Sequence, residues 1–303
     1  MNDLTQLNSA HAIPGMVKFE AGEGGLARIA ITTPLANAHI YLQGAHVTHY
    51  QPAGQGPVLF VSARSQFAPG KAIRGGIPVI FPWFGPRSGD PAAPQHGFAR
   101  SLMWDVQSVA EHADGAISVS LTLPASDLSC RWLPNSFQLV YEISIGASLQ
   151  GSLRVRNTSD SALQFEEALH TYLAVSDVRN IGIEGLSGHT CIDKVDQMKR
   201  KVQPAGALRL VGETDRVYLD APGAVAVFDP AGRRLVISKD GSRSTVVWNP
   251  WAQKARAMSD LGEDQWPRMV CIETANAADN AVTLAPGEQH IMRASISAEL
   301  SRS

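Results

Sequence analysis

Glu273 is a carboxylate in an otherwise apolar segment, and its position there needs a chemical explanation. It interrupts the apolar run from Cys271 to Ala275, which otherwise has the pattern of a buried strand. A carboxylate in such a place must be paired, hydrogen-bonded or functional, because burying an unpaired charge is costly. The alternatives are a structural salt bridge and a role in acid–base chemistry.

His170 is the candidate partner. Alternation over residues 163–174 predicts a strand with Glu166, Ala168, His170 and Tyr172 on one face. On that face, Glu166 would raise the pKa of His170 and keep the imidazole protonated near neutral pH. A solvated strand face with an incidental histidine is the other interpretation. An imidazole and a carboxylate together could carry general acid–base catalysis.

Two further segments carry permanent positive charge. Arg74 precedes two glycines that permit a tight turn, and Gln95, His96 and Arg100 fall within six residues. A planar guanidinium suits a phosphate or carboxylate, and two of them at one site would favour a dianionic phosphate. Arg74 could instead cap a surface turn, and His96 could be a core histidine bonded to main chain.

Other catalytic patterns are missing from the sequence. It has no G-x-S-x-G, no H-E-x-x-H, no dinucleotide fingerprint, and no G-K-[ST] after the glycines of residues 75–76. Cys130, Cys191 and Cys271 are odd in number and far apart, which argues against a disulfide framework and a zinc site. Acid–base chemistry without metal or cofactor, or plain binding, remains.

The composition and charge of the chain limit the kinds of molecule that it is expected to bind. The chain has 303 residues, 44% hydrophobic and 18% charged, with a net charge of −2 and no long basic run. We therefore expect no nucleic-acid partner, and any anion must be held by a few placed cations. The start shows no signal peptide, and the most apolar segment, Ile77–Phe84, contains two prolines and is too short to span a bilayer. These features predict a cytoplasmic protein without membrane partners.

The elements that must position these residues are strands. Short alternating stretches, roughly fifteen to twenty, follow one another between turn residues. Asp114 and Gly115 predict one tight hairpin, and residues 229–232 predict another. A short helix is expected within Trp251–Leu261, while residues 197–202 are compatible with helix or strand. The pattern predicts a single all-β domain of two large, twisted, antiparallel sheets.

In this order, the segments resemble the aldose 1-epimerase (galactose mutarotase-like) superfamily, and within it the hexose-6-phosphate mutarotase branch. The resemblance spans about residues 15–297. The segments that carry it are Ile73–Gly85, Gln95–Arg100, Leu169–Tyr172, Glu213–Tyr218, Val247–Trp251 and Cys271–Ala275.

The resemblance implies a β-supersandwich fold, no metal, no cofactor, and an isomerase that interconverts the α and β anomers of a hexose 6-phosphate, glucose 6-phosphate first. By this resemblance His170 and Glu273 match the catalytic residues, with Glu273 expected as base and His170 as acid. The positions that match substrate-binding residues are Arg74, Gln95, Arg100 and Asp215, with His96 as a sugar contact.

The expected organisation is one domain at residues 16–297, with tails at 1–15 and 298–303, in a monomer. Three alternatives stay open: an epimerase of unphosphorylated aldoses, a non-catalytic sugar-binding module, and a sugar lyase or hydrolase. Hydrolysis normally needs two opposed carboxylates, and the sequence nominates only Glu273.

Overall fold

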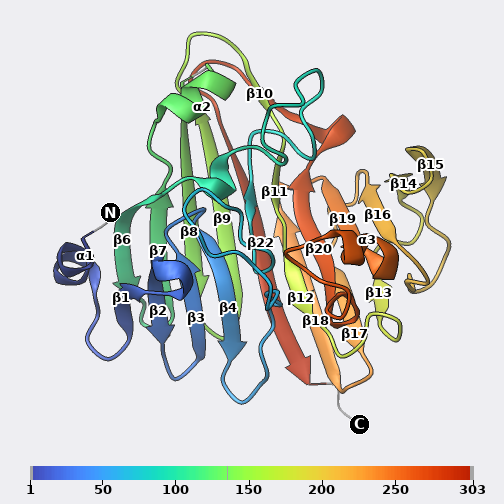
Figure 1. Cartoon of the computed structure of the whole chain (residues 1–303), viewed down its shortest axis with the longest axis horizontal. Helices are drawn as coiled ribbons and strands as arrows, with labels where there is room; N and C mark the ends of the chain where they lie inside the picture. Colours follow the sequence, from blue (N-terminus) through green and yellow to red (C-terminus); the bar gives the residue numbers. More distant parts are fainter. Residues whose placement is uncertain (1–2, 135, 301–303) are drawn as a thin grey trace.

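The computed structural model describes residues 3–134 and 136–300. Strands make up most of this part of the chain, and only three short α-helices occur in it: α1 (Leu4–His11), α2 (Asp127–Trp132) and α3 (Trp251–Ala257). The predicted all-β architecture is therefore confirmed. Figure 1 shows long strands side by side, with α1 and α2 at the margins and α3 in front of the sheet that contains β19 and β20.

One layer is an eight-stranded antiparallel sheet. Its strand order is β13-β17-β18-β22-β9-β8-β7-β6. Its strands are β6 (Asp105–Glu111), β7 (Ile117–Thr122), β8 (Phe137–Ile145), β9 (Leu149–Asn157), β13 (Gly182–Glu184), β17 (Val225–Asp229), β18 (Arg233–Asp240) and β22 (Gln289–Leu300).

A second eight-stranded sheet carries the reactive residues predicted from the sequence. Its order is β15-β14-β16-β19-β20-β11-β5, and β12 also pairs with β20. Its strands are β5 (Val79–Ile80), β11 (Glu167–Leu169), β12 (Tyr172–Ala174), β14 (Thr190–Asp193), β15 (Lys199–Val202), β16 (Thr214–Tyr218), β19 (Ser244–Asn249) and β20 (Met269–Asn276).

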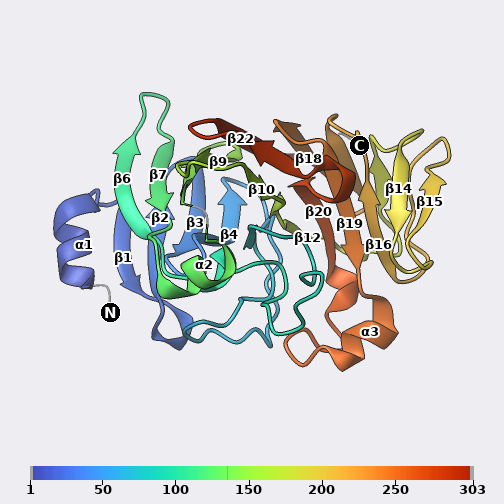
Figure 2. The same ribbon diagram turned by 90° about the horizontal axis from the view of Figure 1, so that it is seen from above.

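Two smaller sheets complete the fold. A four-stranded sheet runs β1-β2-β3-β4, and β10 pairs with β21. Figures 1 and 2 show the four-stranded sheet and the second large sheet lying next to each other against the first large sheet. The strands are β1 (Val17–Ala21), β2 (Ala27–Thr32), β3 (Ala36–Tyr41), β4 (His46–Pro52), β10 (Leu163–Phe165) and β21 (Val282–Leu284).

Alternation along the strands builds the core between these layers. In β7, every second residue is buried, and Ile117, Val119 and Leu121 are fully enclosed. The main apolar cluster combines such residues with others from the four-stranded sheet and the second large sheet, for example Ile29 of β2 and Ile272 of β20. Packing between sheet faces, rather than helix burial, therefore fixes the strands that bear the site.

The predicted turns are confirmed. Asp114 and Gly115 lie in the tight turn between β6 and β7, and residues 229–232 connect β17 to β18. The expected helix within Trp251–Leu261 is α3, and residues 199–202 of the ambiguous segment form β15. Within residues 3–134 and 136–300, no helix has the length and apolarity needed to cross a bilayer.

The single strand predicted over residues 163–174 is wrong in one respect, because three strands, β10, β11 and β12, occupy it. The break between β11 and β12 falls at His170 and Thr171. There the His170 N–H donates to the carbonyl of Pro78 and the Thr171 N–H turns back to the carbonyl of Leu169. Main-chain bonds that the side-chain pattern does not reveal thus interrupt the ladder.

Candidate active site

One face of the second large sheet collects the polar candidates. Across neighbouring strands, Tyr172 pairs with Cys271, Cys271 with Trp248, and Trp248 with Asp215. Because side chains alternate along a strand, Glu273 projects from the same face as Cys271. The sheet register therefore aligns residues that lie far apart in the sequence.

His170 and Glu273 are in contact on this face. His170 Nε2 lies 3.4 Å from Glu273 Oε1, and their side chains are 8% and 1% exposed. Burial raises the pKa of Glu273 well above its usual range. Burial also lowers the pKa of His170 well below its usual range, and the nearby charges of Arg100 and Arg74 lower it further. The remaining polar atoms, His170 Nδ1 and Glu273 Oε2, have no hydrogen-bond partner among the described residues. The pair is thus buried, close and incompletely bonded, as a site awaiting a polar ligand would be.

The predicted influence of Glu166 on His170 is wrong. The Glu166 carboxylate accepts the main-chain N–H groups of Phe84 at 2.8 Å and Ala278 at 2.7 Å. The pKa of His170 is lowered rather than raised. Glu166 therefore ties loops to the sheet, and the charges that act on His170 are cationic.

His96 enters the site from a tight loop. Its main chain has φ +64°, and at the following Gly97, with φ +72°, a Cβ would clash with the carbonyl of Phe81. The imidazole packs edge-on against the rings of Phe84 at 4.9 Å and His170 at 5.6 Å. Only glycine at position 97 lets the main chain of this loop pass so close to the carbonyl of Phe81.

One hydrogen bond and the burial of His96 determine its protonation state and tautomer. The N–H of Gly85 donates to Nδ1 at 3.1 Å. Burial, reinforced by Arg100, lowers the pKa of His96 well below its usual range. A neutral imidazole that accepts at Nδ1 carries its proton on Nε2. His96 is therefore a neutral hydrogen-bond donor beside His170.

Arg74 is held in place from two sides. Its Nε donates to Asp260 Oδ2 at 3.0 Å, and its Nη2 lies 2.9 Å from the same oxygen as an ion pair. Its Nη1 donates to the Tyr172 hydroxyl at 3.0 Å. The Arg74 segment approaches β4 closely because Gly76, with φ +64°, has no Cβ to clash with the carbonyl of Val47. The Tyr172 hydroxyl and the Asp260 carboxylate raise the pKa of Arg74 further.

Arg100 differs from Arg74 because no described carboxylate pairs with it. Its Nη2 donates to the main-chain carbonyl of Gln95 at 2.7 Å. Burial lowers the pKa of Arg100 to about 10, so the guanidinium still carries its charge at neutral pH. A partly buried cation that no carboxylate contacts directly would gain from binding an anionic ligand.

Asp215 is paired with a lysine that the sequence did not nominate. Lys194 Nζ lies 3.6 Å from Asp215 Oδ1 and 4.5 Å from the centre of the Phe84 ring. Burial raises the pKa of Asp215, and Lys194 opposes this rise. Lys194 likewise opposes the rise in the pKa of Glu273. It is thus a third cation of the constellation.

The structure brings most of the predicted residues together. His170, Glu273 and His96 are neighbours, Arg74 and Arg100 both act on His170, and Asp215 belongs to the same cross-strand row. Gln95 is exposed, and the bond that links it to the site is made by its main-chain carbonyl. Residues not nominated from the sequence are Tyr172, Lys194, Trp248 and Asp260.

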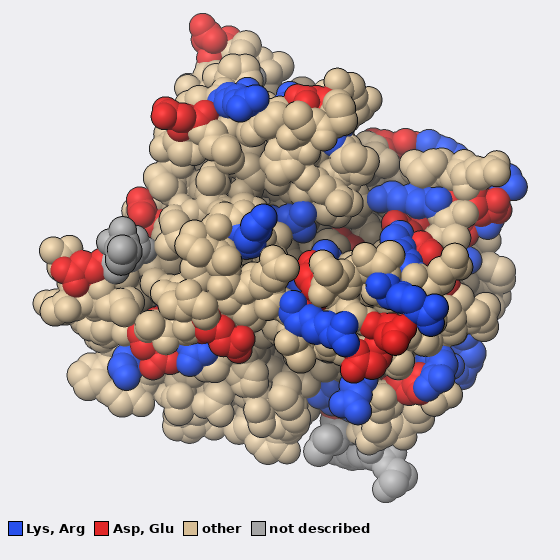
Figure 3. Space-filling model, in the orientation of Figure 1, with Lys and Arg blue, Asp and Glu red and all other residues tan. Residues whose placement is uncertain are grey.

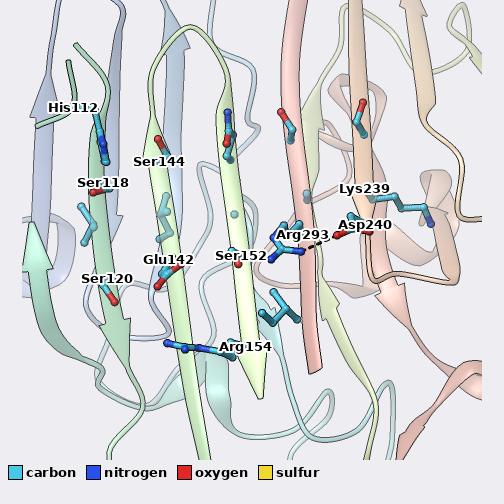
Figure 4. A pocket seen from close by; sticks show the side chains of 18 of the residues that line it. His112, Ser118, Ser120, Glu142, Ser144, Ser152, Arg154, Lys239, Asp240 and Arg293 are labelled. Carbon is cyan, nitrogen blue, oxygen red and sulfur yellow. Dashed lines mark hydrogen bonds and ion pairs between the residues drawn. The ribbon is translucent and has the colours of Figure 1, made fainter. Parts of the chain in front are cut away.

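Two hollows in the surface lie elsewhere. One, of about 660 Å³, lies on the first large sheet, and Figure 4 shows serines and charged side chains along it, with the ion pair between Arg293 and Asp240. The other, of about 440 Å³, is lined by residues near Arg87 and Trp132. Neither contains His170 or Glu273. Within the described residues, no three histidine, cysteine or acidic side chains are placed to hold a metal ion.

The surface charges are mixed. On the face in Figure 3, lysine and arginine side chains alternate with acidic ones and form no extended basic area. This agrees with the expectation that a few placed cations, not a general field, would hold an anion.

Known proteins resemble this chain over most of its length. The family model described as aldose 1-epimerase matches residues 27–297. A protein from Cenchrus ciliaris is 36% identical over 270 residues, covering 86% of this chain and 81% of that protein. One from Escherichia coli K12 is 35% identical over 252 residues, covering 83% of each. Both carry the provisional name glucose-6-phosphate 1-epimerase.

The crystal structure of a provisionally assigned mutarotase from Salmonella typhimurium superposes with a TM-score of 0.89 at 26% identity, covering 98% of this chain and 99% of that one. The fold and these relatives together define the class, a mutarotase with the galactose mutarotase-like β-supersandwich. The chain belongs to the aldose 1-epimerase family. The resemblance seen in the sequence is confirmed, and the protein is an isomerase of sugars.

Proposed function

We propose that this mutarotase acts on a hexose 6-phosphate, with glucose 6-phosphate as its preferred substrate. The observation that carries this proposal is Arg100, a partly buried guanidinium without a carboxylate partner among the described residues, near a second guanidinium at Arg74. Two guanidinium groups whose charges both act on His170 favour a sugar with a dianionic group. The provisional names of the two relatives agree with this choice.

In the proposed reaction, the Glu273 carboxylate takes the proton of the C1 hydroxyl. The electrons of that O–H bond form the C1 carbonyl while the C1–O5 bond breaks, and His170 protonates O5. Rotation about C1–C2 followed by the reverse proton transfers closes the ring on the other face. Each proton transfer by a placed group contributes roughly 10²- to 10⁴-fold to the rate. No proton, electron or group is gained or lost overall, because ring closure reverses each transfer of ring opening.

The proposed substrate would also change the protonation of the pair. Without an anion, burial and the two arginines favour a neutral His170, and burial favours a protonated Glu273. A dianion between Arg74 and Arg100 would offset their charges and make a protonated His170 less costly. The substrate phosphate would thereby promote the ionised form of the pair, in which Glu273 is a base and His170 an acid.

Other residues would hold the sugar. Asp215 is paired with Trp248 on the neighbouring strand and lies on the same sheet face as Glu273. Its carboxylate could accept hydrogen bonds from sugar hydroxyls. His96, as a neutral Nε2–H donor, suits a sugar oxygen. Gln95 has an exposed side chain at the edge of the constellation. We propose these three as sugar contacts and Arg74 with Arg100 as the phosphate grip.

The test compares anomer exchange of glucose 6-phosphate and glucose by NMR magnetisation transfer between their α and β anomeric protons. We expect a higher kcat/KM for the phosphate ester. Arg100→Ala should lower that preference by about 10- to 100-fold, since a charge-assisted hydrogen bond contributes roughly 1.5–3 kcal/mol. Arg200→Ala is the matched control, because Arg200 forms an exposed ion pair with Asp279.

Equal acceleration of glucose and glucose 6-phosphate by the wild type would favour an epimerase of unphosphorylated aldoses. Binding of either sugar without acceleration would indicate a sugar-binding module. An unchanged preference in Arg100→Ala would remove Arg100 from the phosphate grip.

A further inference from the structure

Tyr172 touches both halves of the proposed site. It is 2% exposed and lies opposite Cys271 in the register of β12 with β20. Its ring stacks on the His170 imidazole, with centroids 4.8 Å apart and planes 11° from parallel. Trp248 meets both rings edge-on, at 6.0 Å from Tyr172 and 6.1 Å from His170. The orientation of the imidazole is therefore set by packing against Tyr172 and Trp248.

The other end of Tyr172 belongs to the arginine side of the site. Its hydroxyl oxygen accepts a hydrogen bond from Arg74 Nη1 at 3.0 Å, while Asp260 holds the opposite edge of the same guanidinium. A guanidinium fixed along two edges has little rotational freedom left to lose when it binds an anion. Asp260, Arg74, Tyr172 and His170 thus form one continuous chain of contacts.

The hydroxyl proton of Tyr172 is unused. Arg74 donates to this oxygen, so the Tyr172 hydrogen must point elsewhere, and no described residue accepts it. Burial raises the pKa of Tyr172 to about 12, which keeps the hydroxyl protonated and able to donate at neutral pH. A buried donor without an acceptor among the protein groups is energetically costly, and an acceptor that binds beside it offsets that cost.

We propose that Tyr172 is a phosphate-binding residue that also positions the proposed acid. Its hydroxyl donates to the phosphate held by Arg74 and Arg100, and its ring fixes the plane of His170. This inference rests on the proposed function, since it concerns the same hexose-phosphate site. Phosphate binding would then order the chain from Arg74 to His170, and a phosphorylated substrate would gain in kcat as well as in KM.

The alternative role is that of an ordinary core tyrosine, and a selective substitution separates the two. Tyr172→Phe keeps the stacked ring and removes only the hydroxyl. The control is Tyr50→Phe, which removes a buried hydroxyl that donates to the carbonyl of Gly146 at 3.0 Å on another sheet. A purely structural hydroxyl would affect glucose and glucose 6-phosphate equally.

The first measurement is kcat and KM for both sugars. We expect Tyr172→Phe to raise KM and lower kcat for glucose 6-phosphate, with about a 10-fold loss in kcat/KM. The loss in kcat/KM for glucose should be several-fold smaller than the loss for glucose 6-phosphate, and Tyr50→Phe should change neither substrate selectively. Equal losses for both sugars, or no loss for glucose 6-phosphate, would overturn the proposal.

The second measurement needs no turnover. Titration of the ¹⁵N-histidine-labelled protein with inorganic phosphate should shift the His170 imidazole resonances in the wild type. In Tyr172→Phe the apparent Kd for phosphate should rise about 10-fold. Unchanged affinity would contradict the role of the hydroxyl. A wild type that shows no preference for glucose 6-phosphate would contradict the proposed function instead, so the two failures are distinguishable.

Asp260→Asn provides a second route if Tyr172→Phe does not fold. This variant loosens the far edge of Arg74 without touching the stacked rings. We expect it to weaken phosphate binding by about 10-fold and to lower kcat/KM more for glucose 6-phosphate than for glucose. Unchanged phosphate binding would show that the arginine needs no fixing from this side and would overturn the proposed chain of contacts.

Discussion

Leu169 pairs with Thr274 across the antiparallel strands β11 and β20, and this register brings His170 and Glu273 next to each other. The residue after Leu169 and the residue before Thr274 are necessarily neighbours in an antiparallel ladder. The same register continues past the break in the strand, where Tyr172 pairs with Cys271. The 3.4 Å contact between the imidazole and the carboxylate is therefore a property of the sheet and not of a flexible loop.

The pH profile should report how the substrate changes the pair. The pair loses its proton at the basic limb of the rate profile, and a dianion held by Arg74 and Arg100 opposes that loss. Since kcat reports the enzyme–substrate complex and kcat/KM the free enzyme, the basic limb of kcat for glucose 6-phosphate should lie at higher pH. Stopped-flow polarimetry across the pH range would measure both profiles.

Glucose is the matched substrate for this experiment, because it lacks the dianion. For glucose, the basic limbs of kcat and of kcat/KM should lie at the same pH within the precision of the profiles. A displacement of the same size for glucose would mean that the phosphate does not influence the pair.

A partly buried ion pair between Glu167 of β11 and His290 of β22 should contribute to stability. His290 Nε2 lies 3.0 Å from Oε1 of Glu167, which is fully buried and also accepts from Asn276 at 2.9 Å. His290→Ala would leave that carboxylate without its cation, and we expect a loss of about 3–5 kcal/mol in the free energy of unfolding. Urea denaturation measures it. Arg293→Ala, on the same strand, breaks an exposed pair with Asp240 and should cost less than about 1 kcal/mol.

The same pair should give the stability a pH dependence. Burial alone would lower the pKa of His290, but the hydrogen bond and charge of Glu167 outweigh it and raise the pKa. A raised pKa in the folded state means that the stabilisation is complete below about pH 6.5 and is lost as the pH rises through the folded value. His290→Ala should lack this decline, and an identical decline in the variant would assign it to other groups.

The loop that carries His96 and Arg100 depends on Gly97. Gly97→Ala would combine a strained positive φ with a clash against the carbonyl of Phe81, whereas Gly89→Ala, with φ +75°, has open space around the new Cβ. In both variants, alanine at a positive φ lowers the free energy of unfolding by about 1 kcal/mol. In Gly97→Ala the clash lowers it by about 1–3 kcal/mol more. Thermal denaturation should show the larger loss in Gly97→Ala, with anomer exchange lowered too. Equal losses in both variants would mean that the loop adjusts freely.

The sequence predicts the fold class and the unusual status of Glu273 for identifiable reasons. Alternation and turn residues report strands directly, and a carboxylate in an apolar run is visible without a structure. The distance from Glu273 to His170 could not be predicted, because it depends on which strands pair and in what register. The resemblance to a family supplied the partner, and the β11–β20 ladder supplies the physical reason.

The electrostatics of the site were harder to predict. Glu166 was expected to act on His170, but main-chain N–H groups of Phe84 and Ala278 take its carboxylate, and such long-range bonds leave no local pattern. Asp260 and Lys194 were missed for the same reason. Each lies in an ordinary polar turn, and each becomes part of the site through contacts with distant segments.

The central claim is that His170 and Glu273 act as one acid–base pair on glucose 6-phosphate. Its most direct test is the rate of anomer exchange, measured by NMR magnetisation transfer, in His170→Ala, Glu273→Gln and the double variant. We predict a loss of at least about 10²-fold in each single variant. The double variant should be little worse than either, because residues that act as a unit are not additive. A folded single variant that exchanges the anomers within a few-fold of the wild type would contradict the account.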